Sequence, residues 1–291
     1  MMNRVYLIIA TVFVAIIFVS GILPKYNHKQ SMRIGSYNIR YAAEADEKSG
    51  NNWSKRKYPL VKIIQDYSYD IIGTQEANLN QKAELNALLK DYTSVAHPYG
   101  GQSGHGHHTI TYFKKNRYDL LDSGVFWLSE TPDIPSIGWD ATDRRICQWV
   151  KLKDLNTNKE FYFFNAHFYW KNHSAKLNSG PLIINQIKSI AGDFPCILVG
   201  DLNSEENTEQ IKDISKFLYD ASKIEKEEEL RNWPTNLGGG NFKDPLIDRI
   251  DYIFLSHLIK PITYKVIKDK YDDERYPSDH LPILAEIQIK K

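Results

Sequence analysis

The stretch CILVGDLN, residues 196–203, says most about the fold of this chain. Its first four residues are apolar and predict a short buried strand, which the glycine and the polar residues end. Asp201 and Asn203 are two positions apart, so their side chains can point the same way from an extended backbone. A core strand has no packing need for these groups. The pattern therefore indicates functional residues at the edge of a buried sheet.

Five further apolar segments carry polar clusters of the same kind. They are Ser36–Arg40, Thr74–Glu76, Asn165–His167, Asp251 within 250–254, and Ser278–His280. Singly, each has a structural explanation, such as a helix cap or a hydrogen-bonded core histidine. Together they supply carboxylates, amides and imidazoles, the inventory of a hard-cation site with a general base rather than of a zinc site. Phosphoester hydrolysis needs such a cation, a base for water and donors for the developing oxyanion.

Strand and helix signals alternate early in the chain, and strands dominate later. Strands are predicted at 32–39, 70–74, 109–113, 119–127, 146–153, 160–167, 196–200, 249–256, 263–268 and 281–289, and helices at 53–67, 79–89 and 183–191. Pro181 is expected near the first turn of the last helix. This order predicts an α/β fold with outer helices and two mostly antiparallel sheets facing each other. Residues 223–248, charged and then Gly-rich, are expected to form a mobile surface loop.

The composition is that of an ordinary folded protein. The chain has 291 residues, of which 42% are hydrophobic and 25% charged, which excludes collagen-like, coiled-coil and wholly disordered chains. Lys and Arg number 37 against 36 Asp and Glu, so charge does not imply a nucleic-acid partner. Cys147 and Cys196 lie in apolar runs and are expected to be buried thiols.

Residues 5–23, VYLIIATVFVAIIFVSGIL, are uncharged and about long enough to cross a membrane. They are either a retained anchor or a secretory signal cleaved near Val19–Gly21. Basic residues on both sides leave the orientation open. A short amino-terminal tail before a single span favours a domain outside the cytoplasm. We predict an anchor or signal with its linker over residues 1–30 and one catalytic domain over residues 31–291.

Six motifs, SYNIR, TQE, NAH, GDLN, IDYIF and SDH, occur in this order between residues 31 and 289. Together they resemble the endonuclease/exonuclease/phosphatase superfamily, metal-dependent phosphoesterases that include DNase-I-like nucleases, inositol phosphatases and sphingomyelinases. Residues 121–140 look like a bacterial hydrolase branch of it. The resemblance implies a four-layer α/β/β/α sandwich and a Mg²⁺-dependent phosphoric ester hydrolase, with Mn²⁺ as an alternative. We expect a monomer, and the sequence indicates no protein partner.

The resemblance carries over residue by residue to the metal and the water. Glu76 is the implied principal Mg²⁺ ligand, with Asn38 and Asp279 close to the metal. Asp201 would orient or deprotonate the attacking water.

The same resemblance assigns the phosphate-handling groups. Asn203 would bind the scissile phosphate, and His280, polarised by Asp251, would be the second acid/base or a phosphate-stabilising group. His167 would donate to the phosphoryl oxygens or the leaving group. Arg145 and Trp170 are the further candidates for contact with phosphate and substrate.

Two departures from the family pattern lie near His167. After the NAH motif many relatives read His-x-Asp-His, whereas this chain reads His167-Phe168-Tyr169-Trp170. Near the position of His107, relatives usually carry an acid that orients the imidazole matching His167. The His-rich turn at 104–108 is an alternative transition-metal site.

Two functions are open, a hydrolase and a catalytically silent binding module on the same fold. The intact acids and His280 favour the hydrolase. Its substrate could be a nucleic acid, a sugar or inositol phosphate, or a phospholipid head group. Aromatic residues expected in loops could stack on a base or sugar ring, and they are Trp53, Trp139, Trp170, Trp233 and Phe242. Bulky residues after His167 and the near-zero net charge favour a compact phosphoester over duplex DNA.

Overall fold

The computed structural model describes residues 30–100, 106–171, 174–272 and 274–290. The predicted anchor or signal at 5–23 lies outside these residues. Within the described part of the chain, no helix is long and apolar enough to cross a membrane.

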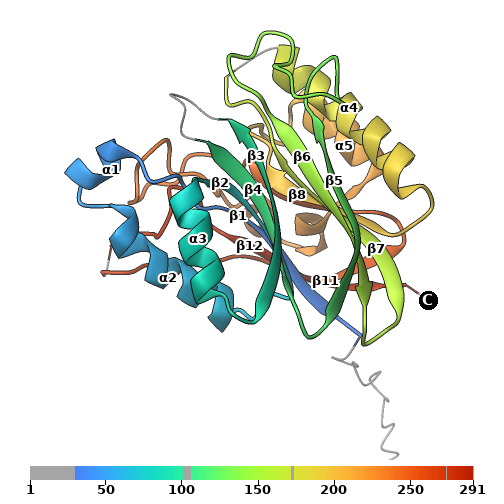
Figure 1. The fold of residues 1–291 in the computed structure, drawn as a ribbon, viewed down its shortest axis with the longest axis horizontal. Coiled ribbons are helices and arrows are strands. Elements are labelled where there is room, and N and C mark those ends of the chain that lie inside the picture. The colour runs from blue at the N-terminus through green and yellow to red at the C-terminus, as the bar shows by residue number, and fades with distance from the viewer. Residues whose placement is uncertain (1–29, 101–105, 172–173, 273, 291) are drawn as a thin grey trace, which may run out of the picture.

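Two six-stranded mixed sheets form the centre of the fold (Figure 1). The first sheet has the order β11-β12-β1-β2-β4-β3, with β1 (Met32–Asn38), β2 (Ile71–Ala77), β3 (Tyr92–Gly100), β4 (His107–Lys114), β11 (Ile259–Val266) and β12 (Ile283–Ile289). The second has the order β5-β6-β7-β8-β10-β9, with β5 (Tyr118–Trp127), β6 (Ile146–Asp154), β7 (Lys159–His167), β8 (Cys196–Asp201), β9 (Tyr219–Asp220) and β10 (Asp251–Leu255).

Each sheet contains a single parallel pair among its strands. Strand β1 runs parallel to β2, and β7 runs parallel to β8, whereas the other named neighbours are antiparallel. The prediction of two mostly antiparallel sheets is therefore confirmed.

Helices cover the outer faces of both sheets and complete an α/β sandwich. The main helices are α2 (Trp53–Asp66), α3 (Leu79–Leu88), α4 (Ser174–Ala191) and α5 (Glu209–Phe217), and the short ones are α1 (Glu44–Lys48), α6 (Glu228–Arg231) and a 3-10 turn at Ala221–Ile224. Figure 1 shows α2 and α3 on one side of the strands and α4 and α5 on the other. Three apolar clusters separate the layers, one between the sheets and one under each helix pair. Both cysteines are buried free thiols, as expected.

The structure corrects several predicted elements. Strand β3 was not predicted, because Pro98 interrupts its pattern, but it lies at the edge of its sheet, where a proline is tolerated. Helix α5 was also missed. Helix α4 begins at Ser174, so Pro181 lies inside the helix and not in its first turn.

Most of the segment 223–248 is exposed or half-buried, as its composition predicts, but three residues anchor it to the body of the domain. Thr235, Leu237 and Phe242 are buried, and Asn236 bridges to both Asp248 and His280. Gly238 and Gly240, with φ of 84° and 80°, allow the backbone to turn beside the residues that precede β12.

Candidate active site

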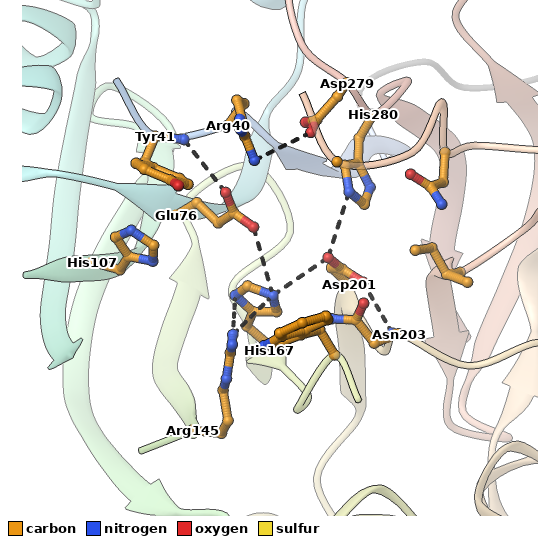
Figure 2. A pocket seen from close by; sticks show the side chains of 14 residues that line it. Arg40, Tyr41, Glu76, His107, Arg145, His167, Asp201, Asn203, Asp279 and His280 are labelled. Carbon is orange, nitrogen blue, oxygen red and sulfur yellow. Dashed lines mark hydrogen bonds and ion pairs between the residues drawn. The ribbon is translucent and has the colours of Figure 1, made fainter. Parts of the chain in front are cut away.

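Strand direction brings the predicted site residues to one edge of the sandwich. Parallel strands end at the same edge, and so Asn38 and Glu76 leave one sheet beside each other while His167 and Asp201 end β7 and β8. Antiparallel neighbours begin at that edge. Figure 2 shows the resulting cluster, with side chains from both sheets pointing toward a common centre.

The beginnings of the antiparallel strands supply the other members of this cluster. They are His107 at the start of β4, Arg145 just before β6, Asp251 at the start of β10, and Asp279 and His280 before β12. Strand β8 can approach β7 this closely because residue 200 is glycine. A Cβ there would lie 2.0 Å from the Ala166 backbone oxygen.

A cavity of about 380 Å³ opens at the cluster. Its polar lining is Arg40, Glu76, Arg145, His167, Asp201, Asn203, Asn236, Asp279 and His280, and its ring-bearing walls are Tyr41, His107 and Trp170. Three of the lining residues, Arg40, Glu76 and Asn203, have φ of 55°, 70° and 47°. Left-handed backbone at non-glycine residues is strained, and such strain concentrates at functional sites.

Asn38 holds the two principal carboxylates together across the sheets. Its Nδ2 donates to Glu76 Oε1 at 3.0 Å and to Asp201 Oδ2 at 2.9 Å. Its Oδ1 accepts from the backbone N–H of Arg40. The side chain predicted to lie near the metal thus acts through its amide N–H groups, which orient carboxylate oxygens toward the cavity.

The two carboxylates have opposite electrostatic surroundings. Burial alone would raise the pKa of Glu76, but the imidazoles of His167 and His107, the Arg40 guanidinium and the Asn38 amide lower it to about 2. Burial raises the pKa of Asp201 to about 7, with Asp251 adding to the rise and His280 opposing it. Glu76 is therefore a permanent anion, whereas Asp201 can exchange a proton near neutrality.

Asp251 and His280 form the predicted Asp-His pair. His280 Nδ1 lies 2.9 Å from Asp251 Oδ2, and its Nε2 lies 3.7 Å from Asp201 Oδ2. Burial alone would lower the pKa of His280, but Asp251 and Asp201 raise it well above its ordinary value. The ring is therefore a buried cation that faces the carboxylate expected to handle water.

His167 lies on the other side of Asp201. Its Nε2 is 3.4 Å from Asp201 Oδ2, and its Nδ1 is 2.8 Å from the hydroxyl of Tyr99. Arg145 Nη1 contacts both ring nitrogens, and Arg145 Nη2 donates to Asp143. Burial and then Arg145 lower the pKa of His167 well below its ordinary value. The two site histidines thus hold different protonation states.

Asp279 and Asn203 lie at the site with partners that the sequence did not indicate. Asp279 Oδ2 accepts from the Gly240 N–H at 2.7 Å and lies 3.6 Å from Arg40 Nη1. Asn203 donates its backbone N–H to Asp201 and its Nδ2 to the Phe168 carbonyl. Arg40 is a cavity residue that sequence reasoning passed over, although it is the last letter of the SYNIR motif.

The carboxylates can hold a divalent cation. Ligand atoms of Glu76, His167 and Asp201 lie within 4.8 Å of one another, as do those of Asp201, Asp251 and His280. Buried acidic oxygens that face a cavity are the donors that a hard cation prefers, and a bound cation would offset the charge that burial disfavours on Asp201. The carboxylates of the first group are the better candidates, because the acid of the second group, Asp251, already pairs with His280. Asp279 is not a member of this group, and Asn38 adjoins it through its hydrogen bonds to Glu76 and Asp201.

The predicted aromatic wall is reduced to one residue. Phe168 and Tyr169 are buried, and only Trp170, 45% exposed, reaches the cavity. Trp53 lies within α2, and Phe242 is buried. In the described part of the His-rich turn, His107 and His108 begin β4 and belong to neither candidate metal group.

A sandwich with acids and histidines at one edge of two sheets defines the class of metal-assisted phosphoesterases. Residues 35–280 match the model of the Endonuclease/Exonuclease/phosphatase family, and the chain belongs to that family.

Several solved structures and a curated relative are similar to this chain. A family protein from Bacteroides thetaiotaomicron has a TM-score of 0.82 and 31% identity over 90% of this chain and 98% of its own. The mannosyl-6-phosphatase of the same organism has a TM-score of 0.80 and 30% identity over 88% and 99%. An uncharacterized protein of Acanthamoeba polyphaga mimivirus is 24% identical over 87% of this chain and 98% of its own length. The human Nocturnin catalytic domain, 18% identical with a TM-score of 0.73 over 90% and 94%, shares the fold.

Proposed function

We propose that this chain is a Mg²⁺-dependent hydrolase that removes phosphate from a compact substrate such as a sugar phosphate. The observation that carries the proposal is the pairing of Asp201, a base with a pKa near neutrality, with the cationic His280 beside it. A general base and a cation on one side of a cavity are what attack by water on a phosphoester requires.

Each side chain of the site has a separate role in the proposed reaction. Asp201, fixed by Asn38 and by the Asn203 backbone, takes a proton from water aimed at the phosphorus. His280 stabilises the negative charge that develops on the phosphoryl oxygens, and Asp251 keeps it protonated. His167 donates an N–H from the opposite side.

The divalent cation would be held by Glu76, the low-pKa anion of the cluster, beside Asp201. When bound, it supplies positive charge that neutralises the phosphoryl oxygens. Arg40 and Arg145 line the same cavity and add fixed positive charge on two of its walls.

Cavity size and lining support a compact substrate. A volume of about 380 Å³ accommodates a phosphate with one sugar ring, and Trp170 supplies an exposed face for that ring. The 30% identical mannosyl-6-phosphatase supports the same choice. A duplex would need phosphate contacts over a wider basic surface, and the net charge of +1 offers no such excess.

The test is a substrate panel on the purified full-length chain with Mg²⁺, Mn²⁺ or EDTA. The panel compares mannose 6-phosphate, other hexose phosphates, bis-p-nitrophenyl phosphate and supercoiled plasmid. We expect sugar phosphate to be turned over best and EDTA to stop the reaction. Plasmid nicking without turnover of any small ester would refute the compact-substrate proposal. No turnover of any member, together with retained binding of a sugar phosphate, would favour the binding module.

We also propose that residues 5–23 hold the domain outside the cytoplasm. Strand β1 begins at Met32, at the end of the sheet opposite Asn38, and its seven residues span roughly 20 Å. An anchor that precedes β1 would join the domain at the end remote from the cavity. The cavity would then face soluble phosphoesters rather than head groups of the same bilayer. Protease added to intact spheroplasts should degrade the domain, and protection until lysis would refute this location.

A further inference from the structure

The hydrogen bonds around His167 are asymmetric. On one side, Nε2 faces two acceptors, Asp201 Oδ2 at 3.4 Å and Glu76 Oε1 at 3.9 Å. On the other side, Nδ1 lies 2.8 Å from the Tyr99 hydroxyl, the shortest contact of the ring. Arg145 Nη1 lies 3.2 Å from Nδ1 and 3.1 Å from Nε2, so it does not distinguish them. Figure 2 shows Arg145 approaching the ring from the wall of the cavity.

These neighbours specify which nitrogen carries the proton. A proton on Nδ1 would leave Nε2 with a lone pair that points toward two carboxylates, which can only accept. The opposite arrangement avoids this repulsion. Tyr99 donates its O–H to Nδ1, and the N–H at Nε2 faces the acids. A ring protonated on both nitrogens would place a second cation about 3 Å from Arg145.

Tyr99 is built into the site to make this bond. It is 1% exposed in β3, and its ring packs edge-on against both His107 and His167, with centroid distances of 5.9 and 5.8 Å. Burial raises the pKa of the Tyr99 hydroxyl well above its ordinary value, so the phenol keeps its O–H and can donate it to His167. His107 occupies the position at which the sequence suggested an orienting acid, but the hydrogen bond to His167 comes from Tyr99.

We propose that Tyr99 is a positioning residue that fixes His167 in the Nε2–H form, so that this N–H points into the cavity as a ready donor. The proposal rests on the proposed function, because the donor is meant for the phosphoryl oxygens or the leaving group. A phenol fixes the ring by donating a hydrogen bond to Nδ1. A carboxylate in its place would accept from Nδ1–H, and Nε2 would then present either a lone pair or the N–H of a cationic ring to Glu76 and Asp201. Tyr99 therefore sets the direction of the bond as well as the orientation of the ring.

The direct test is ¹⁵N NMR of the histidine-labelled full-length chain without metal. Protonated and unprotonated ring nitrogens have well-separated shifts, and His167→Asn identifies the signals of His167. We expect a protonated Nε2 and a bare Nδ1 in the unmodified protein and a mixture of both forms in Tyr99→Phe. The matched control is Tyr112→Phe, because Tyr112 is equally buried and its hydroxyl has no hydrogen-bond partner within the described structure. A proton on Nδ1, or an unchanged tautomer in Tyr99→Phe, would overturn the proposal.

Kinetics supply the second readout. Tyr99→Phe should lower kcat on the best substrate about tenfold with little change in KM, the scale of one hydrogen bond. In a His167→Ala background the same substitution should have no further effect. An equal loss in both backgrounds would mean that Tyr99 acts through packing and would refute the positioning role. A tautomer shift in a chain that hydrolyses no phosphoester would support the positioning and refute the proposed function.

Discussion

Replacing Asp201 by Asn should stabilise the metal-free protein at pH 8 while abolishing its activity. Asp201 is buried and has a pKa raised to about 7, mainly by burial and then by Asp251. The folded protein therefore binds one more proton than the unfolded chain between the ordinary value of 3.8 and about 7. The free energy of unfolding falls as pH rises through that window, because burial makes the ionised form of Asp201 less favourable in the folded state than in the unfolded chain.

The size of the effect follows from the shift and from the lost hydrogen bonds. A rise of about three pKa units corresponds to about 4 kcal/mol of stability lost by pH 8. Asp201 accepts from Asn203 and from Asn38 through different oxygens, and Asn can replace only one of them. That loss costs about 1–3 kcal/mol. The net gain of Asp201→Asn at pH 8 is then about 2 kcal/mol, or roughly 4–8 °C in Tm.

Thermal unfolding in EDTA at pH 5 and pH 8 measures this balance. At pH 5 the ionisation of Asp201 has cost the unmodified protein much less free energy of unfolding than at pH 8. The two proteins should therefore unfold at similar temperatures at pH 5, and Asp201→Asn should be more stable only at pH 8. Mg²⁺ should raise the Tm of the unmodified protein at pH 8 more than that of the variant, because a cation at Glu76 would also offset the buried charge of Asp201. The control is Asp193→Asn, which replaces an exposed aspartate. A variant that is less stable at pH 8, or a Tm difference independent of pH, would refute the reasoning.

Three further outcomes are expected. His280→Asn should lower kcat by roughly 10²–10³-fold, the scale of an acid/base or oxyanion-stabilising group, and a rate within a factor of three of the unmodified enzyme would contradict its role. Trp170→Ala should raise KM for a sugar phosphate several-fold with kcat nearly unchanged, whereas Phe217→Ala, a substitution of an exposed aromatic in α5, should change neither. Arg56→Met should lower the free energy of unfolding by about 3 kcal/mol or more, because buried carbonyls would lose their donors, and denaturant unfolding with less than 1 kcal/mol lost would refute this.

The strand ends and the layer order could be predicted from local sequence. A run such as 196–199 followed by Gly and Asp carries its own signal, because the hydrophobic stretch, the break and the polar cluster are adjacent in the chain. The Asp251–His280 pair was also predicted, and its bond of 2.9 Å confirms that these residues meet. Such features do not depend on which distant segment covers them.

The residues that the sequence did not reveal act through distant partners. Arg56 occupies a helix position that looks solvent-exposed, yet it is fully buried and donates to backbone carbonyls of residues 39, 40, 41, 51 and 277. It joins the segment after β1 to the segment before Asp279. Tyr99 lies in the edge strand β3, which the sequence did not predict because Pro98 interrupts its pattern. Neither role has a local pattern, because each depends on chain segments that come together only in the folded protein.

The reactive side chains of the site lie on strands, whereas several residues of the cavity wall lie on loops. The residues that carry out the reaction are therefore separate from those that can select the substrate. His167 and Asp201 pair with each other at the ends of β7 and β8, and Glu76 lies in β2 between the paired residues Gln75 and Ala77. Tyr41, Trp170 and Gly239 line the same cavity from connections outside the named helices and strands. A loop can change its length or its side chains without moving the carboxylates, because only the parallel pairs β1–β2 and β7–β8 must end at the common edge. The family's reaction therefore follows from the strands of this chain, and its particular substrate must be sought in the loops around Trp170.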